Sequence, residues 1–200
     1  MNRPLISAVV LGLWAVAGAA WGISESLPKN VIKSREEGTV PTAVWLAECE
    51  GLFGDFWAAR REIDTTIAAG GYSQDPTSLA RDLHTLTVPR AQAVADFCSE
   101  YVPDTAWGRQ LRAEVIDAMV SSLASDAHIV EMIEGEARSE VPLADMLAEQ
   151  KEMSETLIAG VYGRFEEAPK KYRGRPEELE TSRAFYFQDF RLRGPAPGDK

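Results

Sequence analysis

The sequence has few of the residues that bind metals, haem or nucleic acids. Its 200 residues include two histidines and two cysteines, so few imidazole or thiolate ligands are available. Lysine and arginine number 21 against 31 aspartates and glutamates, which gives a net charge of −10. Because a phosphate-binding surface needs an excess of positive charge, we expect no nucleic-acid partner.

Catalytic and cofactor motifs are also missing from the sequence. There is no G-x-S-x-G, no G-x-x-x-x-G-K-[ST], no H-E-x-x-H and no C-x-x-C-H. Carboxylates are numerous, but they form solvated runs and no recognisable acid–base pair. We therefore predict no cofactor and favour a protein that is not an enzyme.

Residues 5–23 form the one long stretch without charge. The stretch follows a short cationic start with Arg3 and ends in small residues. This order is typical of a secretory signal peptide over residues 1–20. The stretch is also nearly long enough to span a membrane, so an uncleaved anchor that contacts the inner membrane is the alternative. In both cases we expect an exported protein, either periplasmic or anchored in the inner membrane with the rest outside.

The exported part has the composition and periodicity of a helical protein. Hydrophobic residues make up 45% of the chain, and alternating β-branched segments are absent. We predict an all-α fold, an antiparallel bundle of four to five helices whose core comprises residues 42–168. Residues 21–41 are a predicted linker, 169–193 a basic loop with an aromatic C-terminal helix, and 194–200 a disordered tail.

Apolar spacing and capping residues divide the bundle into helices. The first helix is predicted from Thr42 to the glycine pair at Gly70. The second begins after the N-cap Asp75 and is kinked or divided at Pro89, because proline disrupts a helix interior. A third helix over 107–133, with a break near the Ser-Asp pair at 125–126, a fourth over 142–165 and a terminal one over 177–192 complete the prediction.

The two cysteines predict a disulfide bond. The midpoint between Cys49 and Cys98 falls in the turn after Gly70, so the two residues face each other if the first two helices form a hairpin. An exported chain would oxidise such a pair. The alternative is two unpaired thiols buried in the core. Closing this loop would stabilise the fold by roughly 4 kcal/mol on the chain-entropy model.

One helical segment offers a candidate metal or small-ligand site. His128, Glu131 and Met132 lie within one turn of each other, and a metal or haem there would need further ligands from other helices. The alternative is a surface histidine beside a solvated glutamate. Methionine is a copper ligand in some exported proteins, but at helical spacing it more often fills the core. The methionines of this part of the chain are Met119, Met132, Met146 and Met153.

The C-terminal region holds the candidate interaction surface. Four rings within six residues cannot all face one side of a helix, so the segment is either buried on several sides or partly exposed for docking. A basic loop precedes them on an otherwise acidic chain. The candidate residues are Lys170, Lys171, Arg173, Phe185, Tyr186, Phe187 and Phe190.

These observations favour an exported, noncatalytic helical bundle that acts through protein–protein interaction or as an accessory subunit in the cell envelope. The alternative is a periplasmic bundle that binds a metal, haem or another small ligand.

Overall fold

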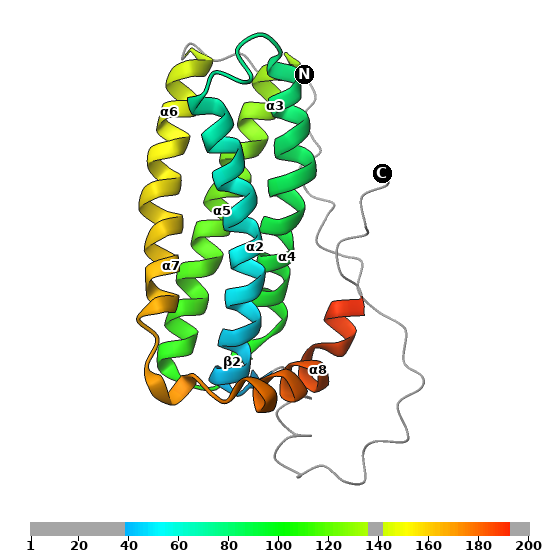
Figure 1. Ribbon diagram of the computed structural model, residues 1–200, viewed down its shortest axis with the longest axis vertical. Coiled ribbons are helices and arrows are strands. Elements are labelled where there is room, and N and C mark those ends of the chain that lie inside the picture. Colours follow the sequence, from blue (N-terminus) through cyan, green and yellow to red (C-terminus); the bar gives the residue numbers. More distant parts are fainter. Residues whose placement is uncertain (1–38, 136–141, 193–200) are drawn as a thin grey trace, which may run out of the picture.

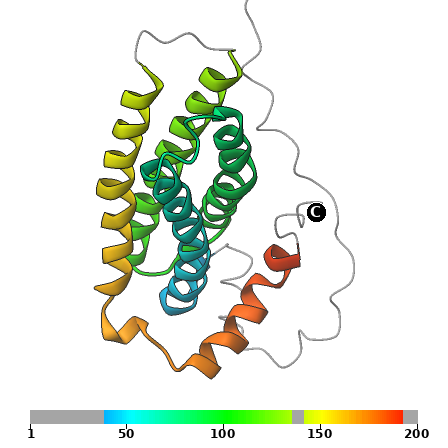
Figure 2. The same ribbon diagram turned by 45° about the horizontal axis from the view of Figure 1, so that its top comes forward.

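Four helical columns stand side by side in the computed structural model, which describes residues 39–135 and 142–192 (Figure 1). The columns are α2 (Thr42–Ala68); α3 (Pro76–Asp82) with the π-helical turn η2 (Leu83–Thr87) and α4 (Val88–Glu100); α5 (Ala106–Glu134); and α6 (Leu143–Met153) with the π-helical turn η3 (Ser154–Ile158) and α7 (Ala159–Glu166). A 3-10 turn, η4 (Lys170–Tyr172), leads to α8 (Pro176–Leu192), which crosses one end of the bundle (Figure 1 and Figure 2). The predicted all-α bundle is therefore confirmed for these residues.

Several predicted segments lie outside the described residues. They are the signal peptide or anchor of residues 1–20, the membrane contact through residues 5–23, most of the linker 21–41 and the tail 194–200. In the part of the chain that the structure describes, no helix is both long and apolar enough to cross a membrane. Export and its two alternative locations stay predictions.

A short parallel strand pair, which the sequence did not predict, connects the first column to the third. β1 (Thr39–Val40) pairs with β2 (Val102–Pro103) just before α2 and α5 begin. Asp104 holds this junction, because its Oδ1 accepts hydrogen bonds from the amide (2.9 Å) and the hydroxyl (2.7 Å) of Thr42. The pair aligns the starts of two columns that are far apart in the sequence.

Neither Pro89 nor Asp126 interrupts its helical column, although the local preferences of proline and aspartate predict a break at both positions. Pro89 lies just after η2, and the helical run continues past it without a division. The second column is therefore one helical run with a widened turn. α5 is unbroken, and the predicted break near Asp126 is wrong. The carboxylate of Asp126 is buried and bonded to other helices, so it does not compete for its own backbone.

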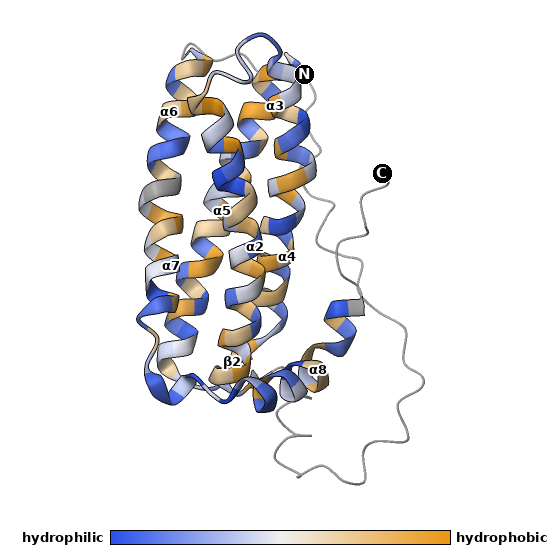
Figure 3. Cartoon of the chain, viewed as in Figure 1, coloured by the Kyte–Doolittle hydropathy of each residue, from blue (hydrophilic) through white to orange (hydrophobic). Residues whose placement is uncertain are grey.

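Two apolar cores fill the bundle, one at each end of the columns. The lower core, at the end that α8 crosses, is built on large rings, namely Trp45, Phe53, Phe56, Phe97, Phe165 and Phe187. The upper core is smaller and consists of Ile63, Leu79, Leu83, Ile129 and Met146. Hydrophilic residues are spread over the outer faces of the columns (Figure 3).

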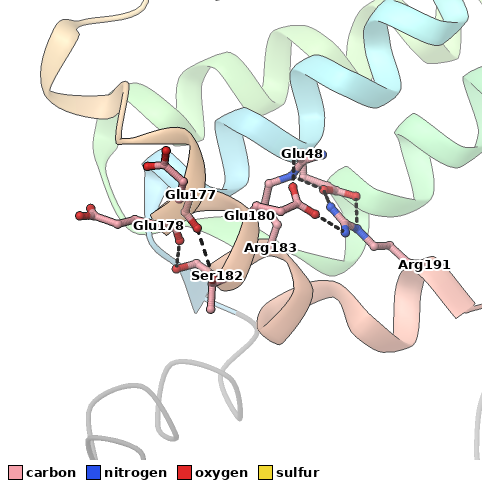
Figure 4. A network of polar contacts seen from close by, with 8 residues as sticks. Glu48, Glu177, Glu178, Glu180, Ser182, Arg183 and Arg191 are labelled. Atoms are coloured by element: carbon pink, nitrogen blue, oxygen red, sulfur yellow. Dashed lines mark hydrogen bonds and ion pairs between the residues drawn. The ribbon is translucent and has the colours of Figure 1, made fainter.

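A buried carboxylate fastens α8 to the first column (Figure 4). Glu48 is 4% exposed and accepts hydrogen bonds from Nε of Arg183 (2.7 Å) and from Nε and Nη2 of Arg191 (3.1 and 2.7 Å). Glu180 binds both arginines at 3.1 and 3.3 Å. We call these four residues the Glu48 network. Burial alone would raise the pKa of Glu48, but the hydrogen bonds and charges of Arg191 and Arg183 outweigh it and lower that pKa.

Replacing Glu48 with Gln should therefore destabilise the fold at neutral pH. The variant keeps the shape but loses the charge that two arginines share, so we expect a loss of about 1–3 kcal/mol in the free energy of unfolding. Urea denaturation measures it. The matched control is Glu50→Gln, which removes a partly exposed pair with Arg173 and should cost less than about 1 kcal/mol.

The same comparison has a pH dependence with a defined sign. Because the pKa of Glu48 is lower in the folded protein, its ionisation stabilises the fold above the ordinary glutamate pKa. This contribution is lost as the pH falls through the lowered pKa, so the wild type and Glu48→Gln should converge in acid. A constant difference from neutral pH into acid would contradict the assignment.

Candidate functional site

A layer of polar side chains separates the two apolar cores. Every column contributes to it, and its members are at most 2% exposed. We call it the polar layer, and it consists of Arg60 from α2, Thr87 from η2, Ser122 and Asp126 from α5, and Gln150 from α6. Buried polar groups cost free energy unless they are paired, so the layer calls for a structural or functional reason.

Asp126 is the centre of the polar layer. Its Oδ1 accepts a hydrogen bond from Nη1 of Arg60 at 2.6 Å and another from Nε2 of Gln150. Its Oδ2 lies 2.8 Å from the hydroxyl of Thr87, which donates to it. One carboxylate on α5 thus contacts each of the other three columns.

Asp64 connects the polar layer to the surface. Its Oδ1 accepts a hydrogen bond from Nε of Arg60 at 3.1 Å, and its side chain is 16% exposed. Burial raises the pKa of Asp64; Arg60 opposes this shift and the charge of Asp126 adds to it. Asp64 is therefore harder to ionise than an ordinary aspartate.

The layer retains hydrogen-bonding capacity that its own contacts do not use. Nη2 of Arg60, Oγ of Ser122 and Oε1 of Gln150 are buried without a hydrogen-bond partner among the described residues. An unpaired buried group of this kind costs about 1–3 kcal/mol. Such atoms are suited to receive a bound molecule or ion.

Both π-helical turns lie next to the polar layer. The buried positions Leu83, Thr87 and Ala91 follow one another at steps of four residues. Four residues of an α-helix turn through about 400°, so each such step rotates the buried face by about 40°. The wider turn η2 takes up this rotation and keeps Thr87 in the layer. In the fourth column, the buried residues Gln150 and Ile158 are eight positions apart, and η3 lies between them and ends at Ile158.

Two cavities lined by described residues open beside the polar layer, and α6 forms a wall of both. The first, which we call the α2–α6 cavity, has a volume of about 420 Å³. Its walls are mostly apolar side chains of α2, α3 and α6, among them Ile67, Leu79 and Leu147. Asp64 and Lys151 also line it, so one side of this cavity adjoins the partners of Arg60.

The second cavity, which we call the α5–α6 cavity, has a volume of about 380 Å³. Gln150 of the polar layer is part of its wall. The other lining residues are Ser125, His128, Ile129, Met146, Glu149 and Met153.

Of the predicted ligand set, only His128 lines a described cavity. His128 lies exposed on α5, whereas Glu131 and Met132 line neither cavity. Glu131 is exposed, and Met132 packs half-buried against the upper core. Within residues 39–135 and 142–192, no group of three or more His, Cys, Asp or Glu side chains could hold a metal ion.

The aromatic rings of α8 pack against the bundle itself. Tyr186 and Phe187 are buried, and Phe185 and Phe190 are half-buried. The rings of Phe187 and Phe190 meet Phe97 edge to face, with centroids 5.0 and 5.4 Å apart. These rings complete the lower core, and a docking role for them stays a prediction.

The basic residues of the loop differ in their surroundings. Lys170 and Lys171 are exposed in η4, while Arg173 binds Glu50 at 3.1 Å and the backbone carbonyl of Phe165. Arg173 thus has an intramolecular role in holding the loop to α2 and α7.

The predicted disulfide is wrong, although the two cysteines do face each other. The sulfur atoms of Cys49 and Cys98 lie 3.8 Å apart as free thiols, whereas a disulfide requires about 2.05 Å. Burial raises the pKa of Cys49, and the adjacent Cys98 adds to the shift. The pair packs as two neutral thiols in the lower core.

Comparison with known proteins does not assign a function. No protein-family model, curated protein or solved structure matches the chain. The functional argument rests on the polar layer and its two cavities.

The polar layer is the feature that sequence reasoning missed. Arg60 lies on the same helical face as Phe56 and Ile63. Asp126 lies about one helical turn before Ile129, on the same apolar face. A charged residue on an apolar face is the available signal. Two such residues of opposite sign, on two predicted helices, indicate a buried pair.

Replacing Asp126 with Leu should destabilise the protein strongly. The variant leaves Arg60 buried beside Asp64 alone, and breaking a buried pair in this way costs about 3–5 kcal/mol. The measurement is the free energy of unfolding in urea. Asp117→Leu, an exposed position on the same helix, is the matched control and should change it by less than about 0.5 kcal/mol.

A double variant tests whether the loss comes from the unpaired charge. Arg60→Met combined with Asp126→Leu should recover most of the stability, because apolar side chains can replace a buried ion pair. A double variant that stays as unstable as Asp126→Leu alone would refute this explanation.

Proposed function

We propose that this chain is an exported, noncatalytic helical bundle that binds an uncharged, mostly apolar small molecule in the α2–α6 cavity. The cavity volume of about 420 Å³ lies in the range of small-molecule pockets, roughly 300–1,000 Å³. Its leucine, isoleucine and alanine walls favour an apolar body. The observation that carries the proposal is an apolar cavity with one polar side that adjoins the polar layer.

The charges at this polar side argue for a ligand without net charge. Asp64 and Lys151 line the same cavity and carry opposite charges. Behind them, Arg60 is bonded to both Asp64 and Asp126. A charged ligand would be attracted by one member of each pair and repelled by the other. A neutral hydrogen-bonding group can contact either side without this conflict.

Tyr72 adds a neutral polar group to the cavity wall. Its hydroxyl donates a hydrogen bond to Oδ2 of Asp82 at 2.8 Å. Burial and this hydrogen bond raise the pKa of Tyr72 to about 12. The phenol therefore stays protonated at physiological pH and adds no charge to the cavity.

The other function expected from the sequence, an accessory protein that binds a protein partner, stays a prediction. One of its supports is the aromatic segment of α8, in which Phe187 contacts Phe97 and Tyr101 of the bundle. Export is supported by the sequence of residues 1–20 alone.

Filling the cavity should abolish binding of an uncharged probe. The probe is N-phenyl-1-naphthylamine, whose fluorescence rises in apolar surroundings. Ala144→Trp places a large ring in the α2–α6 cavity and should weaken binding about tenfold or more, which is about 1.4 kcal/mol. Ala113→Trp, at an exposed position on α5 outside both cavities, should bind like the wild type.

Competition then tests the charge of the ligand. 1-Decanol should displace the probe at lower concentration than decanoate or decylamine, which share its chain length but carry a charge. Equal binding by the wild type and Ala144→Trp would disprove the site. A charged competitor that outperforms 1-decanol would disprove the proposed ligand class.

Export can be tested with a reporter fusion. Residues 1–38 placed before an alkaline phosphatase that lacks its own signal should give active enzyme, because this phosphatase needs the oxidising periplasm. The control fusion carries Leu13→Arg, which places a charge inside the apolar stretch and should prevent activity. An inactive fusion with the natural sequence would contradict export.

A further inference from the structure

Three side chains that bind soft metal ions line the α5–α6 cavity. His128 comes from α5, and Met146 and Met153 come from α6. Met146 is buried and Met153 is half-buried, and both line the cavity. The two methionines are seven residues apart, which is about two helical turns or 10.5 Å along one face.

The register of the two helices brings His128 level with the stretch of α6 between the two methionines. Gln150 on α6 donates a hydrogen bond to Asp126 on α5, so these residues mark the level at which the antiparallel helices face each other. His128 lies two residues beyond Asp126 and is therefore level with the residue two before Gln150. That level falls within the interval between Met146 and Met153, so the three side chains line one cavity from two facing helices.

We infer that the α5–α6 cavity binds one Cu(I) ion through an imidazole nitrogen of His128 and the thioether sulfurs of Met146 and Met153. Thioether ligands select Cu(I) over the harder divalent ions, which prefer carboxylates and imidazoles. The described residues offer such harder ions no group of three or more suitable side chains.

A second, independent observation points to a ligand in the same cavity. Gln150 is 2% exposed and lines the cavity, and its Oε1 has no hydrogen-bond partner among the described residues. A cation in the cavity compensates the partial negative charge on that buried oxygen. The site does not rest on the proposed function, because it lies in a different cavity with different lining residues.

Competition for Cu(I) under anaerobic conditions tests the site. The full-length protein should withdraw one equivalent of Cu(I) from the chromophoric chelator bicinchoninate. His128→Ala, and Met146→Leu combined with Met153→Leu, should each weaken binding about tenfold or more, as ligand losses do. The matched controls are His84→Ala, Met119→Leu and Met132→Leu, whose side chains do not line the cavity and should leave binding unchanged.

The buried thiols are the rival site, and the same titration distinguishes them. Copper retained by the double methionine variant but lost in Cys98→Ala would place the ion between Cys49 and Cys98 and overturn the inference. Failure of the wild type to compete with the chelator would also overturn it.

A second measurement does not depend on the stability of the variants. In the wild type with ¹³C-methyl methionine, one equivalent of Cu(I) should shift the methyl signals of Met146 and Met153 and leave that of Met119 in place. Unmoved signals of Met146 and Met153 in a copper-loaded protein would refute the site.

Discussion

The ion pair between Arg60 and Asp126 is the contact on which the arrangement of the four columns depends. Two opposite charges without solvent exposure tolerate little displacement, because moving either leaves a charge in an apolar interior. Asp126 also accepts hydrogen bonds from Thr87 and Gln150, so the same carboxylate sets the level of every column. Apolar cores tolerate repacking, whereas a buried polar network needs each of its partners in place.

This constraint explains why some elements were predictable from the sequence and others were not. The first helix was predicted from Thr42 to the glycines at position 70, because apolar periodicity and a left-handed glycine act locally. The break near Asp126 was wrong because the local preference of aspartate for turns is overridden by partners on other helices. The π-helical turns could not be predicted, because their positions depend on the spacing of buried residues along each column. That spacing is set by the residues that they contact on neighbouring helices.

The same limit applies to the candidate site. His128 stands out in the sequence because histidine is rare in this chain, and its exposure on α5 leaves it available. The sequence cannot single out the methionines that we propose as its companions, because that choice depends on the register between α5 and α6. That register is fixed by the contact of Gln150 with Asp126. The disulfide prediction had the opposite fault: the hairpin geometry was right, but facing positions do not by themselves form a bond.

The Glu48 network has a consequence for the order in which the molecule is completed during synthesis. Glu48 is separated from Arg183 by 135 positions and from Arg191 by 143. Translation proceeds from the N-terminus, so the carboxylate is made long before either arginine and stays hydrated until both are present. The upper ends of the columns can associate earlier, whereas the lower core is completed only when α8 packs against it. A chain that lacks α8 would thus expose the aromatic side chains of the lower core and leave the carboxylate of Glu48 without an arginine partner.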